Sequence, residues 1–80
     1  MTEGEALVWL ARLFDEPVEN VKTDTARDAI VGWDSLGMLT LMADLDEKFD
    51  VQVGEQEVSG MIAVHDVINL LKKHGKVTSA

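Results

Sequence analysis

The sequence contains no cysteine, no tyrosine and a single proline. Without cysteine, a disulfide framework and zinc sites built from thiolates are excluded. No apolar run approaches the roughly 20 residues that a membrane-spanning helix needs; the longest, such as Leu41-Met42-Ala43, are only a few residues long. The first residues, MTEGEALVWL, lack the basic segment of a secretory signal. We therefore expect a cytoplasmic protein that is not inserted into a membrane.

Basic residues are also scarce: 7 Lys and Arg stand against 15 Asp and Glu, which gives a formal net charge of -8. Contacts with nucleic acid phosphates need clustered Lys and Arg, so a nucleic acid partner is not expected. From Asp34 to Glu57, Lys48 is the only base among many acids. This acidity either serves solubility alone or steers the chain toward basic surfaces of other proteins.

The apolar pattern predicts an all-α fold, a small four-helix bundle with three main helices, one short helix and a long first loop. Residues 3–14 are expected to form the first helix, with apolar side chains on one face: Leu7, Leu10, Ala11 and Phe14. Thr2 and Glu5 fit a capping box at its start. Pro17 ends the helix near Asp15. Residues 17–33 show no sustained apolar periodicity. They are expected to form a long loop whose scattered apolar residues contact the core, and a short helical turn can form at 25–30.

The second helix is expected to run from Ser35 to about Phe49, with Asp34 as its N-cap. Its inward arc, at 100° per residue, contains Met38, Leu39, Leu41, Met42, Leu45 and Phe49. The opposite stripe contains Gly37, Thr40, Asp44 and Glu47, with Leu36 and Ala43 at its edge. Apolar surface is therefore expected to remain exposed along this helix.

Two more helices are predicted, a short one at 55–61 and a last one at 64–73. Ala63 stands where Ser or Thr normally caps a helix, which costs about 1 kcal/mol and leaves the start of the last helix uncertain. Gly75 is expected to stop this helix. The sequence thus predicts one domain over residues 1–75, followed by a flexible tail at 76–80.

The dipeptide Asp34-Ser35 admits three interpretations: a helix start, a nucleophile or a point of attachment. A hydrolase elbow is disfavoured because Trp33 replaces the first glycine of G-x-S-x-G and no strand precedes it; a triad would also need His65 or His74. A phosphate ester on a first-turn serine would gain roughly 0.3–1 kcal/mol from the helix end. From the dipeptide alone, an ordinary N-cap is the simpler interpretation.

No metal site is expected. The acidic segment DLDEKFD, residues 44–50, has the acid density of a calcium loop but lacks its central glycine and its closing glutamate. It also lies inside a strongly periodic helix, so a solvated helix face is the better interpretation. We likewise expect no catalytic residues.

The segment GWDSLGMLTLMADLDEKFDVQV, followed by VSGMIAVHDVINLL, resembles the acyl carrier protein family. The triplet Asp34-Ser35-Leu36 matches the family's D-S-L. The aliphatic spacing and acidic pair of its helix are matched by Leu39, Leu41, Leu45, Asp46-Glu47 and Phe49, and the start of its last helix by Met61, Val64, Asp66 and Val67. The resemblance covers nearly the whole chain.

This resemblance implies that Ser35 carries 4'-phosphopantetheine, installed from coenzyme A by a phosphopantetheinyl transferase. The thiol of that arm would hold an acyl or aminoacyl group as a thioester. Asp34 would cap the helix and help the transferase to recognise the site. The protein would be a non-catalytic, monomeric carrier between a loading enzyme and a downstream acyltransferase or synthase.

Two departures from the family pattern concern the partner surface. Carriers of fatty acid synthesis usually have acids where Gly37 and Thr40 stand, so docking to the enzymes of that pathway is expected to be weaker. Trp33 and Gly37 are more similar to the residues of stand-alone carriers in specialised pathways, such as polyketide, aminoacyl or exopolysaccharide-associated acyl transfer. The expected docking strip consists of Leu36, Gly37, Met38, Thr40 and Ala43, flanked by Asp44 and Glu47.

Two alternatives stay open. Met38, Met42 and Leu45 either line a space for a short acyl chain or simply pack the core, as Met often does. The chain is either a carrier modified on Ser35 or an unmodified helical module that binds partners through its acidic face.

Overall fold

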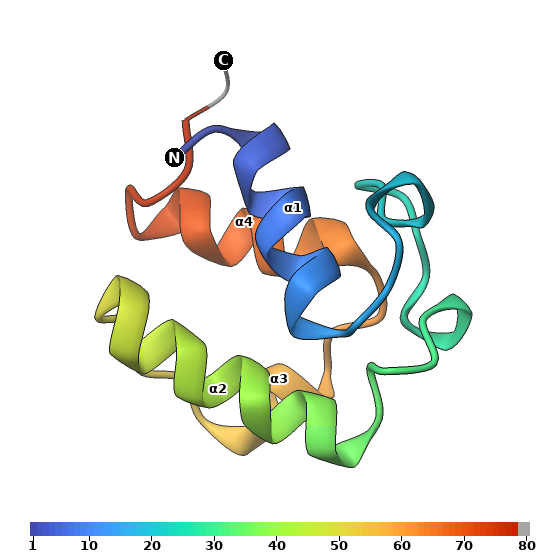
Figure 1. Ribbon diagram of the computed structural model, residues 1–80. Coiled ribbons are helices and arrows are strands. Elements are labelled where there is room, and N and C mark those ends of the chain that lie inside the picture. The colour runs from blue at the N-terminus through green and yellow to red at the C-terminus, as the bar shows by residue number, and fades with distance from the viewer. Residues whose placement is uncertain (79–80) are drawn as a thin grey trace.

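The computed structural model describes residues 1–78 and shows an all-α fold. The helices are α1 (Glu3–Leu13), α2 (Ser35–Phe49), α3 (Glu55–Ser59) and α4 (Val64–Lys73). Two short 3-10 turns, η1 (Val18–Asn20) and η2 (Arg27–Ala29), lie in the loop between α1 and α2. Figure 1 shows α2 along the lower edge, α1 and α4 above it, and the long loop descending on the right. The predicted fold class is confirmed.

The helix ends form as their local sequences predict. The Thr2 hydroxyl accepts a hydrogen bond from the Glu5 N–H at 3.2 Å, and the Glu5 carboxylate accepts one from the Thr2 N–H at 2.9 Å. At the end of α4, Gly75 adopts a φ of 71°, in the left-handed region that favours glycine. The N–H of Lys76 then donates to the Leu71 carbonyl at 2.8 Å. Both the capping box and the glycine stop are confirmed.

The long loop is fixed by burial and by hydrogen bonds to the start of α4. Val21, Ile30 and Trp33 are buried in the main core. The first N–H groups of α4, on Val64 and His65, donate to the loop carbonyls of Thr25 and Thr23, each at 2.9 Å. These bonds join the loop to α4 and hold the segment that leads into α2.

Three expectations need correction. The first helix ends at Leu13 and the third at Ser59, slightly earlier than predicted. Leu39, expected to face inward, is 59% exposed. The reason is geometric: the core contacts only a narrow stripe of α2, in which Leu41 and Leu45 are fully buried.

The residues after Gly75 pack onto the N-terminus. Val77 is only 6% exposed. The N–H of Thr78 donates to the Met1 carbonyl at 2.9 Å, and the Met1 amino group donates to the Lys76 carbonyl at 3.1 Å. Residues 76–78 therefore belong to the folded unit, contrary to the predicted tail; residues 79–80 lie outside the described part of the chain.

Candidate functional site

The site begins where the loop becomes α2. Asp34 has extended backbone angles and is the N-cap of α2. Its Oδ1 accepts a hydrogen bond from the Gly37 N–H at 2.9 Å, and its carbonyl accepts one from the Met38 N–H at 2.8 Å. Ser35 follows as the first helical residue and is exposed. Within residues 1–78 its hydroxyl has no hydrogen-bond partner.

Two glycines bracket this helix start. A Cβ at Gly37 would overlap the Gly32 carbonyl oxygen, and a Cβ at Gly32 would overlap the Phe14 carbonyl oxygen. Three backbone segments, the end of α1, the loop and the first turn of α2, thus lie in direct contact. Gly37 is buried, so it does not belong to the exposed strip in which the sequence placed it. The two glycines in GWDSLG were the sequence signal that could have predicted this close backbone contact.

Beneath the helix start, Trp33 stacks on Phe14 with ring centroids 5.0 Å apart. Arg27 joins the stacked pair of Trp33 and Phe14 to the end of α3. Its Nε donates to the Trp33 carbonyl at 3.4 Å, its Nη1 donates to the Ser59 carbonyl at 3.3 Å, and its Cζ lies 6.0 Å from the Trp33 ring centroid. The sequence pattern gives Arg27 no role, because both of its partners are backbone carbonyls and one of them, on Ser59, lies 32 residues away.

Sequence similarity to known proteins identifies the family of this chain. No family model matches. The acyl carrier protein of Campylobacter curvus is 36% identical over 58 residues, which cover 72% of this chain and 75% of the relative. That of Beutenbergia cavernae is 28% identical over 74 residues, 88% of this chain and 90% of the relative. An acyl carrier protein homolog of Mycoplasmopsis pulmonis is 25% identical over 68 residues, which cover 85% of this chain and 93% of the relative. The chain belongs to the acyl carrier protein family.

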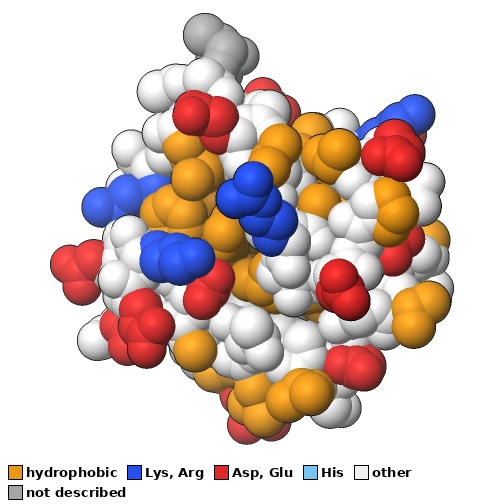
Figure 2. Space-filling model, viewed as in Figure 1, with side chains coloured by type: hydrophobic (Ala, Val, Ile, Leu, Met, Phe, Trp, Pro, Cys, Tyr) orange, Lys and Arg blue, Asp and Glu red, His pale blue; other side chains and the backbone are white. Residues whose placement is uncertain are grey.

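In this family member, the exposed face of α2 near Ser35 is apolar. Leu36 is 72% exposed, and Leu39, Thr40 and Ala43 are also exposed. Met38 is half-buried against the core. Figure 2 shows hydrophobic side chains at the lower edge of the molecule, where α2 lies. The exposed strip thus runs through Leu36, Leu39, Thr40 and Ala43, with Leu39 added to the prediction and both Gly37 and Met38 removed.

The two acids expected to flank this strip differ in their surroundings. Asp44 Oδ2 accepts a hydrogen bond from Trp9 Nε1 at 3.0 Å and lies 3.5 Å from Lys48 Nζ. Glu47 is exposed and forms no ion pair with any residue of the described chain. Asp44 therefore ties α2 to α1, and Glu47 is the acid that remains available to a partner.

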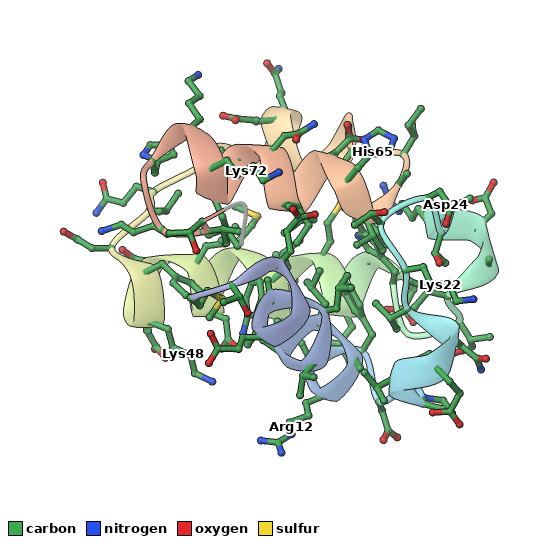
Figure 3. All side chains as sticks on the ribbon, turned by 90° about the horizontal axis from the view of Figure 1, so that it is seen from above. Arg12, Lys22, Asp24, Lys48, His65 and Lys72 are labelled. Carbon is green, nitrogen blue, oxygen red and sulfur yellow. The ribbon has the colours of Figure 1, made fainter. Side chains whose placement is uncertain are left out.

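The surface of this acyl carrier fold is hollowed beside α2. One hollow of about 830 Å³ lies between α1 and α2, and Arg12 and Lys48 project on this side of the molecule (Figure 3). Leu45 is fully buried, while Met42 lines a separate hollow of about 280 Å³. Neither of these two hollows brings Met38, Met42 and Leu45 together, and all three residues pack in or against the core.

Within the described residues, neither His65 nor His74 forms a hydrogen bond with Ser35; His65 Nδ1 instead lies 3.3 Å from Asp66 Oδ1. No group of three or more potential metal ligands occurs in residues 1–78. None of the helices in this part of the chain has the length and apolar character needed to span a bilayer.

Proposed function

We propose that this protein carries an acyl or aminoacyl group as a thioester on 4'-phosphopantetheine attached to Ser35. One observation carries the proposal: in a member of the acyl carrier protein family, the Ser35 hydroxyl is exposed at a capped helix start and has no hydrogen-bond partner among residues 1–78. The protein is thus a non-catalytic substrate of a phosphopantetheinyl transferase, and it works as a cytoplasmic monomer.

The helix start suits the phosphate of such a group. The backbone N–H groups of Ser35 and Leu36 have no acceptor within residues 1–78, and a phosphate beside them gains about 0.3–1 kcal/mol. The Asp34 carboxylate opposes this by charge repulsion, but its Oδ1 is turned to the Gly37 N–H. The attached arm supplies the reactive thiol that a chain without cysteine lacks.

Intact-mass measurement tests the attachment. After incubation with coenzyme A and a broad-specificity phosphopantetheinyl transferase, the wild type should gain one phosphopantetheine. Ser35→Ala, whose exposed position makes it structurally mild, should gain none. An unchanged wild-type mass would instead favour an unmodified interaction module.

The two roles of Asp34 are separable. Asn caps helices about as well as Asp, so Asp34→Asn should keep the stability of the wild type. It removes the charge that we assign to transferase recognition, so the rate of modification should fall. Asp34→Ala should lower both the rate of modification and the stability, the latter by about 1 kcal/mol. A normal modification rate for Asp34→Asn would limit Asp34 to capping.

We place the carrier in a specialised pathway, polyketide, aminoacyl or exopolysaccharide-associated, rather than in fatty acid synthesis. Thr40 supports this, because it is exposed where fatty acid carriers have an acid. Gly37 supports it less than its sequence position suggested, since its contact with Gly32 excludes any side chain. Isolation of the protein from its host and identification of the thioester-bound group would test the assignment; a straight-chain fatty acyl series would contradict it.

The docking surface is the uncharged strip of Leu36, Leu39, Thr40 and Ala43 together with Glu47. A loading enzyme, a downstream acyltransferase or synthase and the transferase would all bind there. Glu47→Lys should raise the KM of the transferase for the unmodified protein, whereas Glu19→Lys, an exposed change in η1, should not. Equal KM values for the two variants would exclude Glu47 from the surface. Asp44 is unsuitable for this test because it bonds to Trp9.

A further inference from the structure

The peptide group between Trp33 and Asp34 leads the chain into α2, and the side chain of Arg27 holds it. The Trp33 carbonyl accepts a hydrogen bond from Arg27 Nε at 3.4 Å, and no second donor of the described chain bonds to it. Because a peptide group is planar, this bond also restricts the direction of the Asp34 Cα. Asp34 in turn caps α2 through the Gly37 N–H, beside Ser35. One peptide group and the helix cap therefore connect Arg27 with Ser35.

Arg27 is itself held in place by neighbouring backbone. Its N–H donates to the Ile62 carbonyl at 2.8 Å, and its carbonyl accepts from the Ile30 N–H at 3.0 Å. The Nη1 of the same guanidinium donates to the Ser59 carbonyl, at the end of α3, at 3.3 Å. A cation is favourable beside the last carbonyls of a helix. One fixed side chain thus ties the end of α3 to the backbone that enters α2.

This bridge depends on properties that are specific to arginine. A guanidinium is planar and carries five N–H donors in a rigid fork, so it can bond two carbonyls at once in a defined geometry. The Arg27 Cζ also lies 6.0 Å from the Trp33 ring centroid, at the distance of a cation–π contact. Lysine offers a compact ammonium on a flexible stem, and glutamine has a shorter side chain without charge. Neither residue can reproduce the complete bridge.

We infer that Arg27 is a positioning residue for the modification of Ser35, because it orients the peptide group that precedes the helix cap. The inference rests on the proposed function. In that reaction, the Ser35 oxygen forms a bond to the phosphorus that bears the pantetheine group of coenzyme A. The bond from this phosphorus to the bridging oxygen breaks, the adenosine bisphosphate part leaves, and the serine proton passes to a base of the transferase. Arg27 makes none of these bonds and acts only on the direction in which the hydroxyl is presented.

Single-turnover kinetics with coenzyme A and excess broad-specificity transferase test this role. Arg27→Gln should lower the transfer rate at saturation by about fivefold or more, since misplacement of a reacting group is costly. The transferase concentration that gives half of the maximal rate should not change, because Arg27 lies outside the proposed docking surface on α2. Arg27→Lys, which can bond one carbonyl at a time, should give an intermediate rate. Arg12→Gln, an exposed change on α1, should behave as the wild type.

Hydrogen exchange of the unmodified protein tests whether Arg27 acts through the helix cap. The Gly37 N–H is bonded to Asp34 Oδ1, so its exchange should be about threefold faster or more in Arg27→Gln. The Glu5 N–H, bonded to the Thr2 hydroxyl at the start of α1, should exchange as in the wild type. A local loss of the cap, rather than general unfolding, would account for this difference.

Val77→Ala separates positioning from a general loss of stability. It truncates a core side chain in residues 76–78, which lie on the opposite side of the molecule from the start of α2 (Figure 1). This variant should unfold more easily, yet its transfer rate should equal that of the wild type while it is folded. A wild-type transfer rate in Arg27→Gln, or a change in its half-saturating transferase concentration alone, overturns the inference while the carrier function stands. An absence of any mass gain in the wild type instead refutes the carrier function itself.

Discussion

Gly37 illustrates how one missing side chain determines the local geometry of the site. Because Gly37 has no Cβ, the first turn of α2 can approach the Gly32 carbonyl. Gly32 in turn lies close to the Phe14 carbonyl. The contact fixes the direction from which the chain enters α2 and hence the position of Ser35. Gly37 stands where related carriers have an acid for docking, but its role in this structure is to allow close packing of the backbone.

Gly37→Ala should therefore destabilise the fold. The added Cβ meets backbone that cannot move away alone, and overpacking of this kind costs about 1–3 kcal/mol. Gly4→Ala is the matched control in the first turn of α1: its Cβ would lie 3.9 Å from Thr2 Oγ1, an ordinary contact. That variant should keep or slightly raise the stability. Urea unfolding measures both, and equal midpoints would refute the contact.

The capping box at Thr2 gives stability a defined pH dependence. The N–H and the hydroxyl of Thr2 hold the pKa of the Glu5 carboxyl below its ordinary value. Since the folded pKa is the lower one, this contribution is present at neutral pH. It is lost as the pH falls from the unfolded pKa through the lowered folded pKa.

Glu5→Gln should consequently flatten the acid side of the stability profile, because the amide does not titrate. Thermal unfolding between about pH 6 and 3 would measure this, with Glu19→Gln as an exposed control that lacks the Thr2 contacts. A wild-type slope in Glu5→Gln would show that another carboxyl is responsible.

At the level of elements, α4 begins without the side-chain cap that most helices use. Ala63 offers no acceptor, yet the helix starts at Val64 as predicted. Two carbonyls of the long loop accept its first N–H groups, and Asp66 Oδ2 accepts from the N–H groups of Ile62 and Ala63 at 2.8 and 3.2 Å. The loop therefore performs the capping, and the start of α4 holds the loop in return.

Ala63→Ser should then gain much less than the roughly 1 kcal/mol that a new N-cap usually provides, because the N–H groups are already bonded. Asp66→Ala should lose about 1–2 kcal/mol, since two N–H groups lose their acceptor. Urea unfolding of the two variants would measure this. A full 1 kcal/mol gain in Ala63→Ser would mean that the loop carbonyls do not cap the helix.

For the whole molecule, the first residues and residues 76–78 close the bundle. Figure 1 shows these two segments together beside α1 and α4. Val77 is part of the core, and its neighbours bond to Met1. A segment that composition marks as a tail thus contributes to the stability of the domain.

Truncation after Gly75 should cost about 1.5–3 kcal/mol, the value of burying an aliphatic side chain of this size. Truncation after Thr78 keeps Val77 and the bonds to Met1, and it serves as the control. Thermal unfolding would compare the two proteins with the full chain. An unchanged unfolding temperature after truncation at Gly75 would show that the last residues add nothing.

Much of the fold was predictable because its signals are local. Asp34 and the apolar spacing after it define α2, and Thr2 with Glu5 defines the start of α1. The exposure of Leu39 and the burial of Gly37 were not predictable, because a helical wheel does not show how wide a stripe the neighbouring elements cover. The roles of Arg27 and Asp44 depend on partners far away in sequence.

The sequence alone determined which helices form and where Ser35 stands, since capping and periodicity act over a few neighbouring residues. Only the tertiary structure decided what surrounds Ser35: the glycine contact beneath its helix, the indole N–H of Trp33 that is buried without a partner among residues 1–78, and the apolar face left exposed on α2. Those features arise where segments distant in sequence meet, and the space available at such contacts is fixed by the packed chain rather than by any local pattern.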